Sequence, residues 1–124
     1  MREQEVGKVI EIHQKKKIFT LEEARELLPV VKRVTKAAHD EITRMTTLLT
    51  AQKEAQKRAA LEEEVQARFR SWIDNVKRLG CEAKGAWLVD FDSGEGYYCW
   101  SFPEPALEHF HGYEEGFGGR TRLQ

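Results

Sequence analysis

The sequence contains few cysteines, and the two present, Cys81 and Cys99, stand alone. Isolated cysteines exclude a disulfide framework and a zinc knuckle, because both need several cysteines at short, regular spacings. We therefore expect two reduced, partly buried thiols. The sequence also lacks any apolar run near the roughly 20 residues that span a bilayer, and its first residues lack the apolar core of a signal peptide. These absences predict a cytoplasmic protein that does not cross a membrane.

An excess of one charge is also missing, since the net charge is −1. Residues 1–80 carry 17 Lys and Arg against 13 Asp and Glu, whereas residues 81–124 carry 3 against 8. The basic residues are interleaved with acidic ones instead of massed on one face, so nucleic-acid binding through Lys15 to Lys17 and the helices is only a second alternative function. The acidic end argues against a surface for polyanions.

The composition that is present, 33% charged and 40% hydrophobic in 124 residues, suits one folded domain. We predict an N-terminal arm over 1–17 and a single domain over 18–124. That domain divides into a helical hairpin at about 20–80 and a β-rich segment at about 81–124.

The first helix has a clear start signal. Thr20 is placed to cap it and Glu23 follows three residues later, which is the spacing of a capping box. Pro29 falls one or two turns in and predicts a kink or a restart.

Two apolar seams with heptad-like spacing follow, and the second ends at Gly80, a good helix terminator. They are Ala24, Leu28, Val31, Thr35, Ala38, Ile42, Met45 and Leu49, and then Leu61, Val65, Phe69, Trp72, Val76 and Leu79. The seams are out of phase, which predicts an antiparallel hairpin that turns between Leu49 and Ala60. That stretch has no Gly or Pro, so one long helix paired with a second chain stays open. Because narrow seams bury little apolar surface and the chain has aromatic residues to spare, we predict a homodimer.

The last third changes period and holds nine of the twelve aromatic residues. Ala86 to Phe91, a turn at Asp92 to Gly96, and Tyr97 to Phe102 predict a β-hairpin. Ala106 to His111 is a possible third strand, followed by an irregular tail. The predicted class is α+β: an antiparallel two-helix hairpin and a small two- or three-stranded antiparallel sheet.

His109 and His111 are the strongest metal signal. On a strand, residues i and i+2 point to one face, which suits two imidazoles on one divalent ion. The simpler interpretation is two ordinary hydrogen-bonded histidines, and no cofactor is predicted.

Asp90 lies inside an apolar strand and needs a partner if it is buried. Arg120 and His111 are the candidates. The three residues form either a polar clasp that ties the tail to the sheet or a catalytic pocket, with His111 as acid or base and Arg120 on an anionic substrate.

The tail from Gly112 to Gly119 is glycine-rich but has neither a P-loop nor a dinucleotide fingerprint. The simplest interpretation is that its glycines let Phe117 tuck under the sheet. Trp100, Glu104, Phe117 and Arg120 are candidate binding residues.

Several short motifs occur in order along the chain. They are Phe19 to Ala24, Leu27-Leu28-Pro29, Leu88 to Phe91, Cys99-Trp100, Phe110-His111, Gly116-Phe117 and Gly119-Arg120. On these residues the chain, from about Lys17 to Leu123, resembles a small bacterial family known as domain of unknown function number 2203.

The chain departs from that family in four places. Pro103 precedes Glu104 where the family often has Gly, Phe110 replaces a Trp, His109 matches no family mark, and the link between the helices is shorter than in many members. The resemblance implies a small α+β fold and no particular activity.

We therefore expect a non-enzymatic structural or protein-interaction module that self-associates through its helices. The alternative is a small, hydrolase-like metal- or anion-binding enzyme that uses Asp90, His111 and Arg120.

Overall fold

The computed structural model describes residues 17–123, so the predicted arm at 1–17 lies almost entirely outside the described residues. Two helices, α2 (Leu21–Ala51) and α3 (Ala55–Arg78), pack side by side and are joined by a three-residue turn. The predicted helical hairpin is confirmed, and the alternative of one continuous helix is wrong. Gln52 opens the turn in an extended conformation, which breaks the helix without Gly or Pro.

The signals at the helix ends behave as predicted. The Thr20 hydroxyl accepts a hydrogen bond from the amide of Glu23 at 3.1 Å, and the Glu23 carboxylate accepts one from the amide of Thr20 at 2.9 Å. Gly80 follows α3 with a φ of +91°, in the left-handed region that favours glycine. The predicted restart at Pro29 does not occur, because α2 runs unbroken from Leu21 to Ala51.

The β-rich segment forms a five-stranded antiparallel sheet in sequential order. Its strands are β1 (Glu82–Ala83), β2 (Leu88–Asp92), β3 (Tyr97–Ser101), β4 (His109–His111) and β5 (Thr121–Arg122). The α+β class is confirmed, whereas the expected two or three strands were too few. The additional strands β1 and β5 have two residues each, too short for any alternation of polar and apolar residues to be visible.

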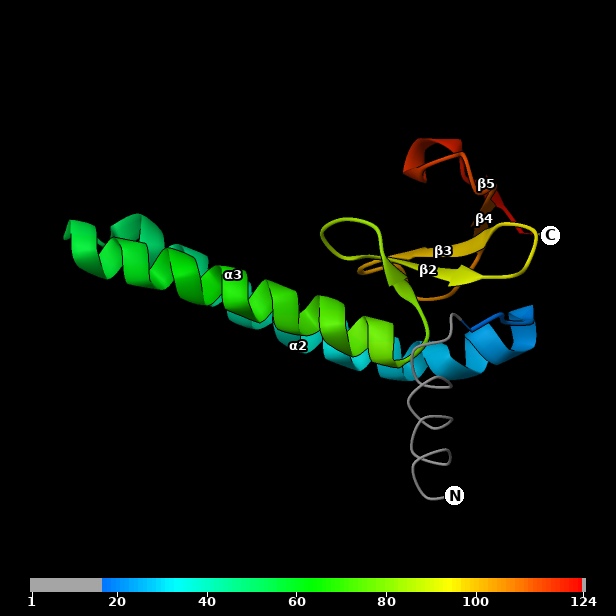
Figure 1. Cartoon of the computed structure of the whole chain (residues 1–124), viewed down its shortest axis with the longest axis horizontal. Helices are drawn as coiled ribbons and strands as arrows, with labels where there is room; N and C mark the ends of the chain where they lie inside the picture. The colour runs from blue at the N-terminus through cyan, green and yellow to red at the C-terminus, as the bar shows by residue number, and fades with distance from the viewer. Residues whose placement is uncertain (1–16, 124) are drawn as a thin grey trace, which may run out of the picture.

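The two faces of the sheet differ in chemistry. Val89, Phe91 and Trp100 are fully buried on the face that packs against the helices. They meet Ala24, Leu28 and Val31 of α2 and Trp72 and Val76 of α3. The opposite face carries Asp90, Cys99 and His111. The C-terminal segment with the 3₁₀ turn η1 (Phe117–Gly119) lies on this side of the sheet, away from the helices (Figure 1).

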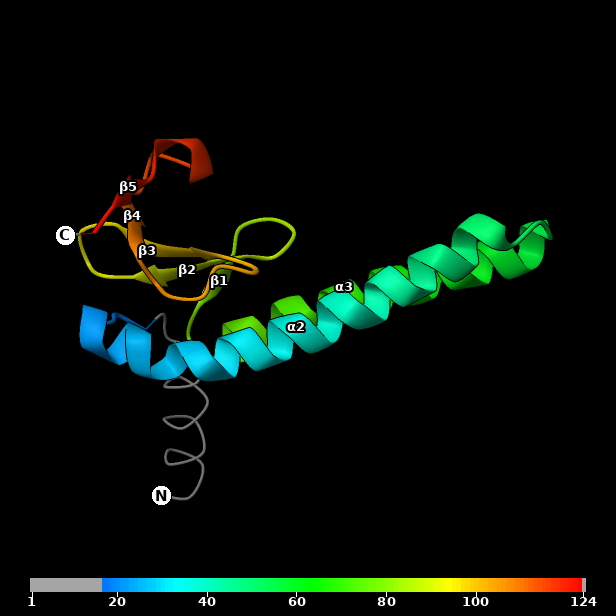
Figure 2. The same ribbon diagram turned by 180° about the vertical axis from the view of Figure 1, so that it is seen from behind.

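The helical hairpin extends far beyond the sheet, which covers only the end near Thr20 and Gly80 (Figures 1 and 2). Between residues 36 and 71 only Met45 is buried. Among residues 17–123, neither helix has a stretch long and apolar enough to cross a membrane.

Candidate functional site

The polar face of the sheet brings three chemically active side chains together. Asp90 on β2 pairs directly with Cys99 on β3. His111 on β4 pairs with Tyr97, two residues from Cys99 and therefore on the same face. Asp90, Cys99 and His111 are all buried, with 1%, 2% and 4% of their surface exposed. Cys99 was not among the residues predicted to meet here.

Hydrogen bonds fix the orientation of the His111 ring. Its Nδ1 lies 2.8 Å from the carbonyl oxygen of Gly112, and its Nε2 lies 2.9 Å from Oδ2 of Asp90. Because a carbonyl oxygen only accepts, Nδ1 carries a proton and donates it. A further proton must lie between Nε2 and Oδ2, on the nitrogen or on the oxygen, for that contact to be a hydrogen bond. The predicted Asp90–His111 contact is therefore present.

Burial dominates the acid–base properties of the other two groups. It raises the pKa of the Asp90 carboxyl, although the charge of His111, the neighbouring Cys99 thiol and the His111 hydrogen bond act in the opposite direction. Burial, with the neighbouring Asp90 carboxylate, raises the pKa of the Cys99 thiol to about 12. Cys99 is therefore a protonated thiol at neutral pH and not an activated nucleophile.

Arg120 does not complete the predicted trio. Its Nη1 and Nη2 atoms donate to the two carboxylate oxygens of Glu104 at 3.0 and 2.6 Å, which makes a bidentate pair. Glu104 Oε1 also accepts from the Ser101 amide at 2.8 Å. Partial burial opposes ionisation of Glu104, but the Arg120 hydrogen bonds, the Ser101 amide and the Arg120 and His109 charges outweigh it and lower the pKa of Glu104. The tail is thus held to the sheet through Glu104 and not through Asp90.

The remaining candidate residues lie around this pair. Trp100 is buried in the core, and its indole N–H donates to the carbonyl oxygen of Glu104 at 2.8 Å. His109 shares a face with His111, as predicted, but its Nδ1 lies 3.7 Å from Glu104 Oε2. Phe117 does not tuck under the sheet: 47% of it is exposed, and the Arg120 guanidinium lies 4.2 Å from its ring centroid.

Loss of the Arg120–Glu104 pair should destabilise the protein measurably. Arg120→Ala should lower the free energy of unfolding by about 2 kcal/mol, because it removes two charge-assisted hydrogen bonds from a mostly buried carboxylate. Arg122→Ala is the matched control, because Arg122 binds Glu108 with side chains that are 72% and 43% exposed. Its loss should cost well under about 1 kcal/mol. Equal losses in urea denaturation would contradict the assignment.

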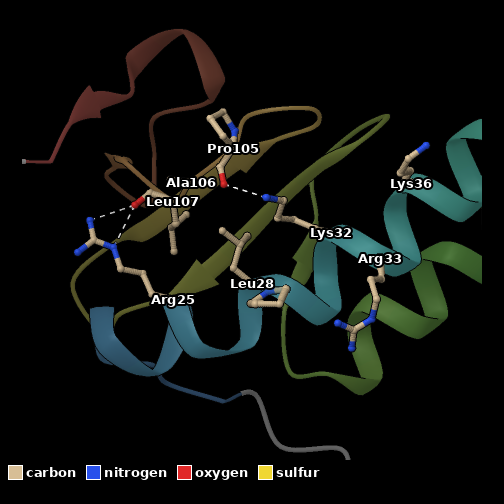
Figure 3. A pocket seen from close by; sticks show the side chains of 9 residues that line it. Arg25, Leu28, Lys32, Arg33, Lys36, Pro105, Ala106 and Leu107 are labelled. Carbon is tan, nitrogen blue, oxygen red and sulfur yellow. Dashed lines mark hydrogen bonds between the residues drawn. The ribbon is translucent and has the colours of Figure 1, made fainter.

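One cavity lies on the polar face of the sheet, and a larger one lies beside α2. The first has a volume of about 270 Å³, and Asp90, Cys99 and His111 line it together with Lys84 and Tyr97. The other, of about 610 Å³, lies between α2 and the segment before β4 (Figure 3). There Arg25 and Lys32 donate to the carbonyl oxygens of Leu107 and Pro105, so their charged ends fasten the loop to the helix.

A family model described as "Uncharacterized conserved protein (DUF2203)" matches residues 17–123. The chain belongs to the DUF2203 family. No curated protein and no solved structure matches it. The short motifs that carried the resemblance supply the polar residues of the site: Asp90, Cys99, His111 and Arg120. The DUF2203 description itself assigns no activity to them.

Proposed function

We propose that the protein is a non-enzymatic interaction module that pairs with a second copy of itself through the projecting half of its helical hairpin. The observation that supports this most directly is the exposed apolar surface there. Met45 is the one buried residue between positions 36 and 71, Leu48 is 57% exposed, and six further apolar residues are only half-buried. These six are Ala38, Ile42, Leu49, Leu61, Val65 and Phe69.

The projecting half of the hairpin has a basic region next to an acidic one, so two copies can pair through opposite charges. The tip, residues 44–58, carries four basic residues and one acidic residue. They are Arg44, Lys53, Lys57, Arg58 and Glu54. The adjoining band, residues 37–43 and 59–66, carries no Lys or Arg and five acidic residues. They are Asp40, Glu41, Glu62, Glu63 and Glu64.

Two hairpins that lie antiparallel would place the basic tip of each against the acidic band of the other. Such a contact uses the same surface on both copies, as a two-fold symmetric dimer requires. It would convert each two-helix seam into part of a four-helix bundle and cover the half-buried residues. The sheet residues argue against the enzyme alternative, since Arg120 is neutralised by Glu104 and the Cys99 thiol is protonated.

Light scattering coupled to gel filtration tests this proposal. We expect twice the monomer mass at micromolar concentration, with weaker association as salt screens the charges. Leu48→Glu should yield a monomer of unchanged helicity, because Leu48 is already exposed. Thr46→Glu is the matched control, since it adds the same charge to an exposed position on roughly the opposite side of α2. A wild-type monomer at all concentrations would refute the proposal.

A further inference from the structure

We infer that Asp90, Cys99 and His111 form a binding site for one divalent transition-metal ion of the Zn²⁺ or Co²⁺ type. The site is independent of the proposed self-association, because it lies on the sheet face that is turned away from the helices. Its ligands are one thiol sulfur, one imidazole nitrogen and one carboxylate oxygen. That set suits borderline divalent ions better than Mg²⁺ or Ca²⁺, which prefer oxygen alone.

The spacing of the three side chains is close to that of ligands around a bound metal ion. One potential ligand atom from each residue lies within 4.8 Å of the others, and all three residues are buried. Asp90 and Cys99 are directly paired on neighbouring strands, so backbone hydrogen bonds fix their separation. A small inward movement of the side chains would bring the three atoms to the distances of about 2.0 to 2.3 Å at which such ions are held.

Two polar atoms are arranged as a metal site needs them. Oδ1 of Asp90 is buried and has no hydrogen-bond partner, although Asp90 is only 1% exposed. A buried oxygen of that kind is costly unless something binds it. His111 donates its Nδ1 proton to the carbonyl oxygen of Gly112, which leaves Nε2 directed at the site. Metal-binding histidines are commonly held by such a hydrogen bond.

The charges of the ligand set suit a divalent ion. A thiolate, a carboxylate and a neutral imidazole carry two negative charges together, which balance the charge of M²⁺ inside a buried site. Because such ligands bind a metal in their deprotonated forms, binding should weaken as the pH falls.

The fourth coordination position would face the cavity of about 270 Å³ next to the three ligands. Tyr97 and Tyr113 are part of its wall, with ring centroids 5.1 Å apart. Lys84 reaches over the Tyr97 ring at 4.7 Å. A site with three protein ligands and a position open to a cavity can hold water or a small ligand at the ion.

The test uses the full-length, tag-free protein after treatment with a chelator. Zn²⁺ competition against a chromophoric chelator should give one ion per chain, and Co²⁺ should give the absorption of tetrahedral cobalt with a thiolate ligand. The Zn²⁺ affinity should fall as the pH is lowered, because the ligands bind the ion in their deprotonated forms. Cys99→Ala should weaken binding by more than about 100-fold, since loss of outer hydrogen-bond partners alone costs 10- to 100-fold.

Two matched variants separate this site from chance binding. His109→Ala removes the histidine two residues away on the same face, and Cys81→Ser changes the other buried cysteine. Both should bind Zn²⁺ as the wild type does. Circular dichroism checks that Cys99→Ala remains folded, and Asp90→Asn provides a second ligand variant if it does not. Failure to bind Zn²⁺ at micromolar concentration, or equal affinity in Cys99→Ala, Asp90→Asn and wild type, would overturn the inference.

Discussion

Trp100→Ala should lower the free energy of unfolding by about 3 to 5 kcal/mol, the usual cost of truncating a large buried aromatic side chain. Trp100 is 0% exposed and lies on the central strand β3, against the cluster that joins the sheet to both helices. The change also leaves the carbonyl oxygen of Glu104 without the indole donor that holds it at 2.8 Å. For a domain whose total stability is typically about 5 to 15 kcal/mol, this is a large fraction.

Thermal and urea denaturation followed by circular dichroism measure the effect. The midpoint of thermal unfolding should fall by at least about 10 °C in a chain of this size. Trp100→Phe is the control, because it keeps an aromatic ring against the core and removes the hydrogen bond and part of the volume. It should lose clearly less stability than Trp100→Ala. Similar losses in the two variants would show that the hydrogen bond to Glu104, and not the packing of the ring, dominates.

The helical half of the fold could be predicted because its signals are local. Thr20 and Glu23 specify the start of α2 through contacts three residues apart, and Gly80 specifies the end of α3 through its own backbone. The repeating apolar positions specify which sides of the helices meet. None of these signals depends on residues that are distant in the sequence, so reading them requires no knowledge of the sheet.

The site was predicted only in part, because it depends on register. The turn of β2 and β3 was expected to span Asp92 to Gly96, whereas the strands end at Asp92 and resume at Tyr97. A five-residue turn would place Tyr98 opposite Asp90, and the actual four-residue turn places Cys99 there. Since a one-residue slip exchanges the faces of a strand, this small error hid Cys99 from the candidate site.

Arg120 shows a different limit. The sequence offers two carboxylates, Asp90 and Glu104, and charge alone does not choose between them. The choice follows from the turn after β3. There the Glu104 carboxylate accepts a hydrogen bond from the Ser101 amide, and the Glu104 carbonyl oxygen accepts one from the Trp100 indole N–H. These bonds hold the Glu104 carboxylate where Arg120 reaches it. That arrangement depends on backbone positions that composition and spacing do not reveal.

His111→Ala should lower the free energy of unfolding by about 3 kcal/mol or more at neutral pH, because it leaves the buried Asp90 carboxylate without its partner. A double variant, Asp90→Asn/His111→Ala, has the same missing ring and no carboxylate at position 90. It should be more stable than His111→Ala alone at neutral pH. The comparison thus isolates the cost of the unpaired charge from the cost of the space left by the imidazole.

The difference in stability between His111→Ala and the double variant should change with pH in a definite direction. Burial raises the pKa of Asp90 in the folded protein above its ordinary value of 3.8, so the folded state binds a proton more readily than the unfolded state does. Stability contributed by such a group is greatest below pH 3.8 and is lost as the pH rises through the folded pKa. Removing His111 removes two of the influences that lower this pKa, its charge and its hydrogen bond. In His111→Ala the free energy of unfolding should therefore keep falling to a higher pH than in the wild type.

Urea denaturation of the two variants across the acidic and neutral range measures this directly. Their stabilities should converge near pH 3.8, where Asp90 is neutral in the folded state, and diverge as the pH rises. Equal stabilities throughout would mean that the pKa of Asp90 in folded His111→Ala is not raised and that burial of this carboxylate costs nothing. A divergence would show that an unpaired Asp90 charge destabilises the apo fold, and a divalent ion bound to Oδ1 and to Cys99 would remove that cost. Added Zn²⁺ should then raise the stability of the wild type more than that of Asp90→Asn.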